Sequence, residues 1–224
     1  MGLAFAAREI LRVSRENFYD ESGKRWTNTS SKLSTTQKKF GETSLYVNGA
    51  ANLRYVPGIT FGGKDFAISC WLYATAASTA GQGFFSWGAD KTEGFQSWRN
   101  ASNLAAFATI IGDAINTVTP DASKPTFTAN QWNHFEVDYR QSDNTFFFFF
   151  NGELVDSQTD ANFATARTFP FYIGYMPRST AYFTGYIDEF FITDQLLHSE
   201  NFEPQTEPYV FDSDKTIALL HFEN

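Results

Sequence analysis

Two carboxylates that lie close together in the sequence are residue types that could do acid–base chemistry. Glu136 and Asp138 stand two positions apart in a stretch from His134 to Arg140 that alternates polar with apolar residues. In an extended strand such residues share one face, and two carboxyl groups about 5 to 5.5 Å apart are what a retaining glycoside hydrolase uses. The same alternation is typical of a strand with a solvated, charge-mixed outer face, and we favour this interpretation.

The other reactive groups are less suited to catalysis. Asp188 and Glu189 are adjacent, so on a strand their side chains are expected on opposite faces. Cys70 lies in an apolar stretch and is expected to be an inert core residue. The three histidines are scattered without metal-ligand spacing: His134, His198 and His221. The sequence therefore predicts no catalytic residues and assigns no metal ligands.

The amino-acid composition limits the classes of binding partner that can be expected. The chain has 224 residues, a formal charge of −8 and 18% aromatic residues. This length fits one large β domain, and the aromatic content favours strands. The acidic balance argues against nucleic acid as a partner, because phosphate binding depends on clustered lysines and arginines. No apolar run approaches the roughly 18 residues of a membrane span, so no membrane partner is expected.

The chain divides into an N-terminal arm at 1–16 and one sandwich at 17–224. The arm has helix-like spacing of apolar residues and is expected to be a short helix or a disordered terminus. Arg8 and Glu9 interrupt its apolar start, so a cleaved signal peptide is not expected. Beyond it, short alternating runs broken by turn residues are typical of an antiparallel sandwich. The run 66–73 is predicted to be a central strand, because both of its faces are apolar or aromatic.

A three-stranded meander is predicted after Trp132. Strands at 134–140 and 145–150 are followed by Asn151-Gly152 and a third strand at 153–156. The Asn-Gly pair indicates a type I′ hairpin turn, in which both central residues need positive φ. Five consecutive phenylalanines at 146–150 leave no polar face, so this strand is expected to be covered on both sides.

Four segments recur in the order and spacing of a known family. They are Phe40-Gly-Glu-Thr-Ser-Leu-Tyr-Val-Asn-Gly49, Asp65-Phe-Ala-Ile-Ser-Cys-Trp-Leu72, Trp132-Asn-His-Phe135 with Asn151-Gly-Glu-Leu-Val155, and Gly185-Tyr-Ile-Asp-Glu-Phe-Phe-Ile192. Together they resemble the laminin-G-like, concanavalin A-like family of bacterial, phage and extracellular proteins. The resemblance implies an all-β fold, a two-sheet antiparallel jelly-roll sandwich. It does not imply one function, because this fold hosts lectins, hydrolases, adhesion modules and structural spacers.

The end of the chain departs from the family pattern. The resemblance implies that a strand like 218–224 comes first and leads into an Asp-rich turn like 18–23, whereas here 216–224 is a displaced terminal strand. We favour pairing in cis beside the first strand, because the termini of a sandwich lie close together. Donation to a neighbouring subunit is the main alternative. An unpaired strand is a third, although it would leave an apolar edge exposed.

The resemblance also bears on catalysis and metals. No third carboxylate follows at position 140, so the glucanase pattern of the family is not met. We expect no cofactor, with calcium as the alternative, since laminin-G domains often hold one Ca²⁺ at a rim through oxygen ligands. The candidate ligands are Asp20, Asp143, Asp156, Asp188, Asp194 and Asp212. Asp188 is instead expected to tie down a neighbouring loop by accepting hydrogen bonds from backbone N–H groups.

Aromatic and cationic residues in two loop-rich stretches are the candidates for sugar binding, which uses aromatic platforms with polar neighbours. They are Trp87, Trp98 and Arg99 in the first stretch, and Tyr175, Arg178 and Tyr182 in the second. The alternative for the two tryptophans is that they close the ends of the sandwich.

These observations predict a non-catalytic protein of the virion surface or the extracellular space. A decoration, fibre or tail-associated module would act in assembly and host adhesion, as a homo-oligomer or with other virion or surface proteins, gripping neighbours through its arm and terminal strand. The alternative is a carbohydrate-binding lectin module that takes host surface glycans. A glycoside hydrolase acting through Glu136 is a third hypothesis.

Overall fold

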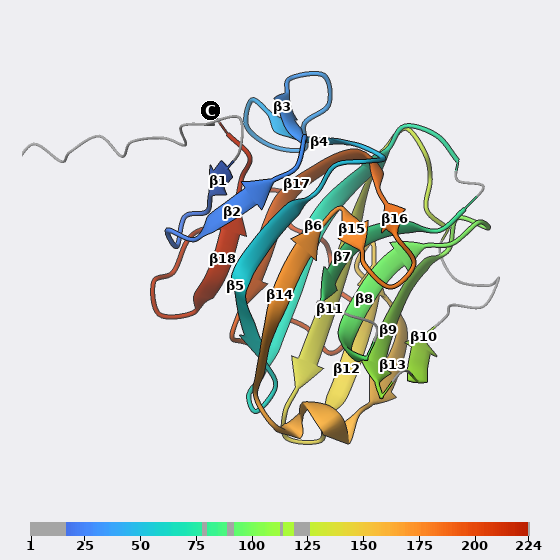
Figure 1. Ribbon diagram of the computed structural model, residues 1–224, viewed down its shortest axis with the longest axis vertical. Helices are drawn as coiled ribbons and strands as arrows, with labels where there is room; N and C mark the ends of the chain where they lie inside the picture. Colours follow the sequence, from blue (N-terminus) through green and yellow to red (C-terminus); the bar gives the residue numbers. More distant parts are fainter. Residues whose placement is uncertain (1–16, 78–79, 89–91, 113, 119–125, 224) are drawn as a thin grey trace, which may run out of the picture.

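The computed structural model describes residues 17–77, 80–88, 92–112, 114–118 and 126–223, which fold into two large antiparallel sheets packed face to face (Figure 1). The predicted arm at 1–16 lies outside the described residues. The two-sheet antiparallel sandwich confirms the predicted fold class. Among the described residues the helical content is one 3₁₀ turn, Ala161–Ala164.

Eight strands form the first sheet, in the order β1-β2-β5-β14-β7-β8-β9-β10. Their bounds are Asn17–Tyr19 (β1), Arg25–Asn28 (β2), Leu53–Phe61 (β5), Arg167–Ile173 (β14), Gln82–Trp87 (β7), Glu93–Arg99 (β8), Ala105–Ile111 (β9) and Ala114–Val118 (β10). A two-stranded ribbon lies against β7 and comprises β15 (Tyr175–Met176) and β16 (Ala181–Tyr182).

The second sheet has the order β13-β12-β11-β6-β17-β4-β3, with a further strand, β18, paired to β17. Its strands are Glu153–Thr159 (β13), Thr145–Phe150 (β12), Trp132–Arg140 (β11), Phe66–Ala74 (β6), Thr184–Thr193 (β17), Ser44–Asn48 (β4), Lys32–Ser34 (β3) and Thr216–Leu220 (β18). Strand β6 lies between β11 and β17 and is buried along its length except for the half-buried Tyr73, so the predicted central strand is confirmed.

Phenylalanine rings fill much of the space between the sheets. Phe61 of the first sheet lies 4.5 Å from Phe66 of the second and 5.3 Å from Phe95, as measured between ring centroids. Phe85 meets Phe135 edge to face at 5.6 Å across the same gap. Tilted and edge-to-face aromatic pairs of this kind add to the free energy of area burial. The core therefore explains why the chain carries so many phenylalanines.

The predicted meander is confirmed as β11, β12 and β13. Asn151 and Gly152 have φ values of +52° and +77°, the positive values that a type I′ turn requires. All five phenylalanines of β12 are buried, and Phe149 on the outer face packs at 5.2 Å against Phe202, outside the sheet. The apolar strand is thus covered on both sides, as the sequence predicts.

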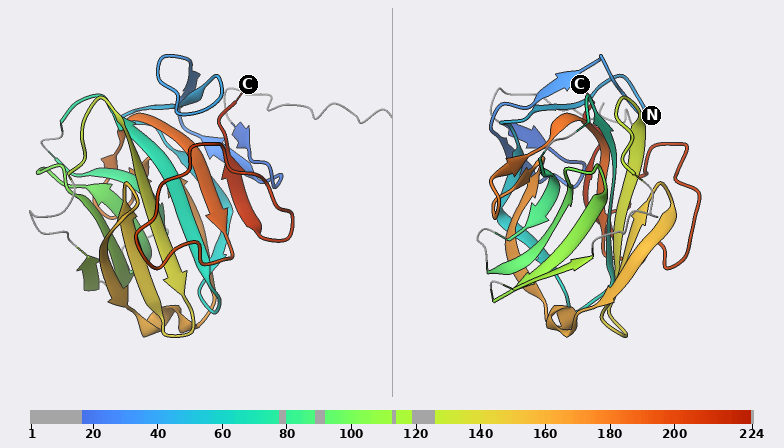
Figure 2. Two further views of the ribbon diagram at one scale, coloured as in Figure 1. Left: turned by 180° about the vertical axis from the view of Figure 1, so that it is seen from behind. Right: turned by 90° about the vertical axis from the view of Figure 1, so that its right-hand side faces the viewer.

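The covering residues belong to a long connection, 194–215, between β17 and β18, which we call the cover segment. Seen from behind, it crosses the outer face of the second sheet over β6 and β11 (Figure 2). Phe202 N donates to Gly152 O at 2.9 Å, and Leu154 N donates to Asn201 Oδ1 at 2.8 Å. This face of the sheet is therefore interior rather than solvated.

Strand β18 pairs within its own chain. It runs antiparallel to β17, with Phe190 opposite Leu220, where the ladder of β17 with β4 has ended. The first strands lie close by: Glu21 N donates to Leu219 O at 2.9 Å, and the rings of Phe18 and Phe222 meet at 6.3 Å. The cis arrangement is the one found, although the direct partner is β17 rather than the first strand.

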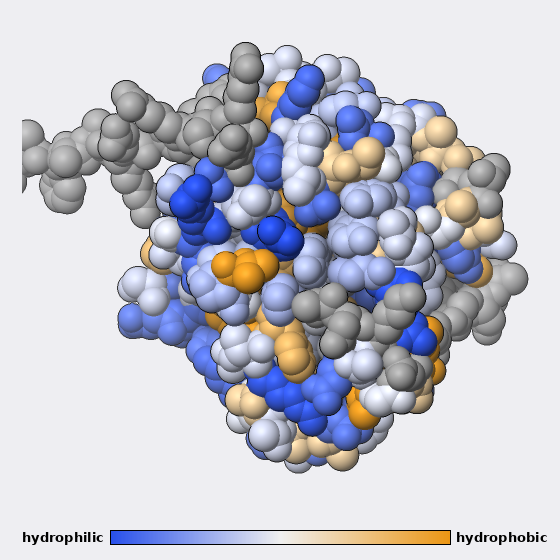
Figure 3. Space-filling view, viewed as in Figure 1, coloured by the Kyte–Doolittle hydropathy of each residue, from blue (hydrophilic) through white to orange (hydrophobic). Residues whose placement is uncertain are grey.

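The surface shows no large apolar area on the face drawn in Figure 3, where apolar residues are scattered among polar ones. The large apolar side chains exposed among the described residues are Tyr19, Val56, Ile115 and Val210. In the part of the chain that the structure describes, no helix has the length and apolar character to cross a membrane.

Candidate functional site

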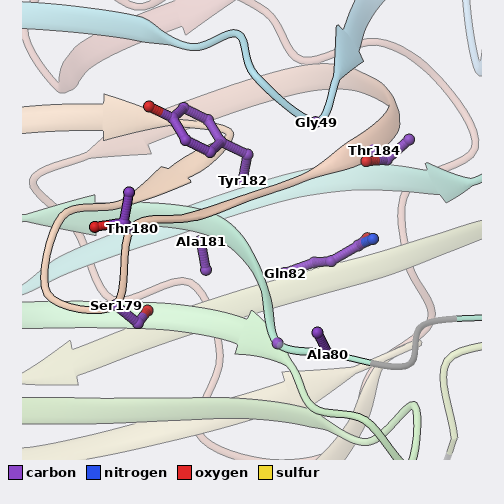
Figure 4. A pocket seen from close by; sticks show the side chains of 9 residues that line it. Gly49, Ala80, Gln82, Ser179, Thr180, Ala181, Tyr182 and Thr184 are labelled. Atoms are coloured by element: carbon purple, nitrogen blue, oxygen red, sulfur yellow. The ribbon is translucent and has the colours of Figure 1, made fainter.

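A hollow of about 480 Å³ opens beside the β15–β16 ribbon, where the ribbon lies on the outer face of the first sheet (Figure 4). Its lining residues are small or polar: Gly49, Ala80, Gly81, Gln82, Ser179, Thr180, Ala181, Tyr182 and Thr184. None of them carries a formal charge. The hollow therefore offers hydroxyl, amide and aromatic contacts, which suit an uncharged polar ligand.

The ribbon sits close to the sheet because position 83 is a glycine. A Cβ atom at Gly83 would lie 2.6 Å from the side chain of Met176 and 2.8 Å from its backbone nitrogen. Any larger residue at position 83 would push the ribbon away from the sheet. The second contact is a hydrogen bond of 2.9 Å from Ser86 Oγ to Tyr175 O. These contacts set the position of one wall of the hollow.

Two tyrosines stiffen the ribbon. The rings of Tyr175 and Tyr182 stack at 4.4 Å with an interplanar angle of 30°, and Tyr172 meets Tyr175 at 5.7 Å. Tyr182 is half-buried and lines the hollow. An aromatic ring held in place in this way presents apolar area together with a hydroxyl at low conformational cost.

Gln82 is oriented by a buried cation. Arg99 is 1% exposed, and its Nε and Nη2 donate to Gln82 Oε1 at 3.0 and 2.8 Å. Its Nη1 donates to Asn103 Oδ1 at 3.2 Å, and its guanidinium lies 5.3 Å from the ring of Phe127. Burial lowers the pKa of Arg99 to about 10, so it stays charged at neutral pH.

The hydrogen bonds from Arg99 also determine which end of the Gln82 amide is available to a ligand. With its oxygen held by Arg99, the NH₂ group is the end left to meet a ligand, and it offers two donors. Figure 4 shows the Gln82 side chain extending toward the side where Thr184 lies, while the ring of Tyr182 points away from Gln82. The hollow thus has a hydrogen-bond donor on the Gln82 side, and Tyr182 stands at its rim.

The predicted sugar-contact residues are divided by the structure. Tyr175 and Tyr182 form the ribbon, and Arg178 is half-buried in its turn. Trp98 is half-buried, and its ring adjoins Gly81 at the hollow. Gln82, Gly49 and Thr184 were not predicted, because their residue types carry no signal until pairing places them together.

Two of the predicted contacts are wrong. Trp87 is 2% exposed, stacks at 5.2 Å on Phe95 and donates from Nε1 to Ile59 O at 2.7 Å, so it belongs to the core. Arg99 is buried behind Gln82 and cannot reach a ligand directly. Its contribution is to hold the amide.

The prediction that the polar face of β11 is exposed to solvent is also wrong. Glu136, Asp138 and His134 are all 0% exposed, because the cover segment lies over them. Asp138 Oδ1 accepts from Leu197 N at 2.6 Å and from His198 N at 3.0 Å. His198 Nδ1 lies 2.5 Å from Glu136 Oε1. Burial raises the pKa of both carboxyl groups.

The expectation that Asp188 and Glu189 lie on opposite faces is wrong as well. The pairing of β17 with β6 shifts between Asp188 and Phe191, and Glu189 has a φ of +48°. This bulge turns both carboxylates to the outer face. Asp188 Oδ2 accepts from Lys39 N at 2.8 Å and from Phe40 N at 3.3 Å, which confirms its predicted role in holding a loop. Burial raises the pKa of Asp188 to about 7.

Glu189 joins two other parts of the chain. Its Oε2 accepts from Tyr209 N in the cover segment at 2.9 Å, and its Oε1 lies 2.6 Å from His221 Nδ1. Cys70, in contrast, is fully buried, and burial raises the pKa of its thiol well above the ordinary value, so its prediction as an inert core residue is confirmed.

Metal ligands are clearer in the structure than in the sequence. Among the described residues, one group of three Asp, Glu, His or Cys side chains has its ligand atoms within 4.8 Å of one another: Glu136, Asp138 and His198. Two of its members had been expected in solvent, and the third among scattered histidines. The six aspartates named for calcium do not form such a group in the described part of the chain, and calcium binding stays a prediction.

The described residues form a jelly-roll sandwich with an uncharged hollow beside the β15–β16 ribbon. A family model described as the concanavalin A-like lectin/glucanases superfamily matches residues 49–201, so the chain belongs to this family. A search of curated protein sequences finds no significant match.

Solved structures of low sequence identity share the fold. Domain 4 of AbnA, an extracellular arabinanase from Geobacillus stearothermophilus in complex with arabinotriose, is 15% identical, with a TM-score of 0.60 over 82% of this chain and 93% of that chain. The CBM40 of the Ruminococcus gnavus IT-sialidase bound to alpha2,3 sialyllactose is 13% identical, with a TM-score of 0.52 over 73% and 95%. A heptameric SAP-like pentraxin from Limulus polyphemus is 10% identical, with a TM-score of 0.50 over 67% and 72%.

Proposed function

We propose that this protein is a non-catalytic carbohydrate-binding module that takes a neutral glycan in the hollow beside the β15–β16 ribbon. The observation that carries the proposal is the combination of a fixed tyrosine ring with an oriented amide donor in an uncharged cavity. Sugar rings offer an apolar face for the first and hydroxyl groups for the second. Two structures of the same fold hold carbohydrate ligands, arabinotriose and sialyllactose, and this supports the choice of ligand class.

The lining residues favour a neutral glycan over an acidic one. Among the described residues, no lysine, arginine or histidine lines the hollow, and the guanidinium of Arg99 is already bound to Gln82 and Asn103. The chain as a whole has a formal charge of −8. A carboxylated sugar would therefore meet no free cation in the cavity and would approach a protein of like charge.

The burial of the carboxylates supports the part of this proposal that the protein does not cleave the glycan. The carboxylates that resemble a hydrolase pair, Glu136 and Asp138, are fully buried and tied to the cover segment. A glycosidic bond cannot lie between groups that are covered in this way. The described residues that line the hollow include no carboxylate.

Binding is tested with a glycan array followed by calorimetry on the hits, using wild-type protein and two variants. Gln82→Glu retains an oxygen for Arg99 but loses the NH₂ donors, and Tyr182→Ala removes the ring. We expect each variant to weaken binding about tenfold or more, as loss of a ligand-facing hydrogen bond or ring does. Tyr19→Ala, at an exposed tyrosine on β1, is the matched control and should bind normally.

A blank array overturns the proposal, and so does binding that survives both variants. Turnover of any glycan that binds would overturn the non-catalytic part alone. Reducing-sugar release with wild-type protein and Glu136→Gln separates these outcomes.

The setting proposed for this binding is a virion or extracellular surface. Because β18 completes the sheet of its own chain, strand donation no longer supports assembly, and the assembly role as decoration, fibre or tail protein rests on residues 1–16. Light scattering on full-length protein and on a variant lacking residues 1–15 tests it. Strictly monomeric behaviour of both would count against a homo-oligomer.

A further inference from the structure

The strongest unexplained feature lies away from the hollow, under the cover segment. Here β11 contributes Glu136 and Asp138, and the cover segment contributes His198. The carboxylate oxygens and the imidazole nitrogen all lie within 4.8 Å of one another. Ligands of one metal ion are separated by about 3 to 4 Å, because each lies roughly 2 Å from the ion. The donors of this group spread over up to 4.8 Å, so they would have to move slightly inward for all three to reach one ion.

Each carboxylate has one oxygen that the cover segment does not bond. Glu136 Oε2 and Asp138 Oδ2 are buried and accept no hydrogen bond from the cover segment, whereas the other oxygen of each group does; the two carboxyl groups lie against each other and near Ser69. His134 Nε2 stands 4.0 Å from Glu136 Oε2 but is 2.8 Å from Ser69 Oγ, to which it is bonded. A buried carboxylate oxygen without a donor costs free energy. Two of them at one place are satisfied either by a proton shared between the carboxyl groups or by a bound cation.

Nearby lysines and arginines do not supply a positive charge. Lys39 is engaged elsewhere, with its Nζ 3.7 Å from the centre of the Trp71 ring. No Arg or Lys forms a salt bridge to Glu136 or Asp138 in the described part of the chain. A divalent cation would neutralise both carboxylates at once.

We propose that Glu136, Asp138 and His198 bind one divalent transition-metal ion of the zinc type, which joins β11 to the cover segment. Two carboxylates and one imidazole are a zinc ligand set with a fourth position open for water. The imidazole selects against Ca²⁺ and Mg²⁺, which take oxygen ligands. The side chain of His198 is 34% exposed, so an ion can enter from its side of the site.

The surroundings hold two of the ligands in place. Asp138 Oδ1 accepts two backbone N–H bonds, which leaves Oδ2 directed elsewhere. The ring of His198 stacks on Phe202 at 3.6 Å with an interplanar angle of 5°. Such outer contacts orient ligands and raise metal affinity. The ion would couple the cover segment to the sheet, because the ligands come from both.

The experiment is a Zn²⁺ titration of the full-length, tag-free protein that has been treated with chelator, followed by calorimetry and by the thermal unfolding temperature. We expect one Zn²⁺ per chain and a rise in Tm on binding, since a ligand of the native state stabilises it. Ca²⁺ and Mg²⁺ should leave the Tm unchanged. Co²⁺ gives a second readout, because its visible absorption reports the coordination of the bound ion.

The variants are Glu136→Gln, Asp138→Asn and His198→Asn, the second of which retains the oxygen that accepts from the cover segment. Each should weaken Zn²⁺ binding about tenfold or more. His221→Gln is the matched control, because His221 also faces carboxylates but lies in no ligand group of the described residues. Near-ultraviolet circular dichroism without metal identifies variants that fail to fold, and Asp138→Asn should pass this test.

Three outcomes overturn the proposal. They are no Zn²⁺ binding to the wild-type protein, binding that is equal in the folded variants, and binding that His221→Gln abolishes. The glycan experiment is independent of this result, because the hollow and this site share no residue.

Discussion

The guanidinium of Arg99 holds the side-chain oxygen of Gln82 through two hydrogen bonds of 3.0 and 2.8 Å. The two residues face each other across the β7–β8 pair, where their backbones are in register. Neither the register nor the burial of Arg99 is visible in the sequence. The pair links the core to the hollow, since one partner lies in each.

Replacing Arg99 with lysine tests this link. Lysine retains the charge but loses the planar fork, so the Gln82 oxygen is no longer held by two donors. We expect a loss of about 1 to 3 kcal/mol of unfolding free energy, the range for hydrogen bonds to buried charged groups, together with weaker glycan binding. Urea unfolding and calorimetry measure the two effects. Arg25→Lys, at an exposed position of β2, should change neither.

Tyr209 anchors the cover segment in two ways, which substitution separates. Its ring stacks on Phe191 at 4.2 Å, and its hydroxyl donates to Ser69 Oγ at 2.9 Å. Tyr209→Phe removes the hydrogen bond alone and should cost about 1 kcal/mol. Tyr209→Ala also removes the ring and should cost about 3 kcal/mol. Equal urea midpoints for the two variants would show that the stacking contributes nothing.

The hairpin turn at Gly152 is expected to tolerate no side chain. Its φ is +77°, and a Cβ atom there would lie 2.0 Å from Phe202 O in the cover segment. Gly152→Ala should therefore cost more than the roughly 1 to 3 kcal/mol of left-handed backbone strain. Gly23→Ala is a close control, since Gly23 has a φ of +85° and nothing within 4 Å of an added Cβ. If thermal unfolding shows equal losses, the clash with the cover segment is absent.

His221 should make stability depend on pH. Burial alone would lower its pKa, but the hydrogen bond with Glu189 and the charges of Glu189, Glu21 and Asp188 together raise it above the ordinary value of 6.5. The folded state therefore holds this proton more tightly than the unfolded state. The stabilisation is fully present below pH 6.5 and is lost as the pH rises through the folded pKa.

The measurement is the unfolding free energy of wild-type protein and His221→Gln at about pH 6 and about pH 8.5, which lie on either side of the expected transition. The difference between the two proteins should be larger at the lower pH. A difference that is constant, or that grows with pH, would contradict the raised pKa.

Local patterns predicted the parts of this fold that depend on local geometry. The turn at Asn151 follows from the two residues that form it, and the burial of 66–73 follows from two apolar faces. The burial of Glu136 could not be predicted, because the segment that covers it comes about sixty residues later in the chain. The strand that contains Glu136 alternates polar and apolar residues as a strand with one solvated face does. The alternation of polar and apolar residues alone cannot show whether the polar face of a strand meets solvent or another segment of the chain.

The prediction that Asp188 and Glu189 lie on opposite faces of their strand was wrong for a different reason. One extra residue in a strand reverses the parity of everything beyond it, and a bulge leaves no mark in the hydrophobic pattern when its neighbours are all apolar. The hollow was only partly predictable. Aromatic residues in a loop predicted Tyr182, whereas Gln82 became a candidate only when Arg99 was found to be buried behind it.

The displaced terminal strand gives the last prediction. Strand β18 covers the part of the β17 edge beyond β4, and its residues Leu219 and Leu220, with Phe222 just after it, are almost fully buried. Removing residues 216–224 would expose an unpaired apolar edge, which templates association with other chains. We expect the truncated chain to be less stable and to aggregate, as measured by light scattering during thermal unfolding. A synthetic peptide of residues 216–224 should restore monomeric behaviour by pairing in trans, because the edge it leaves is otherwise intact. A truncated chain that stays monomeric with an unchanged Tm would show that β18 is dispensable, and the family-like sandwich would then end at β17.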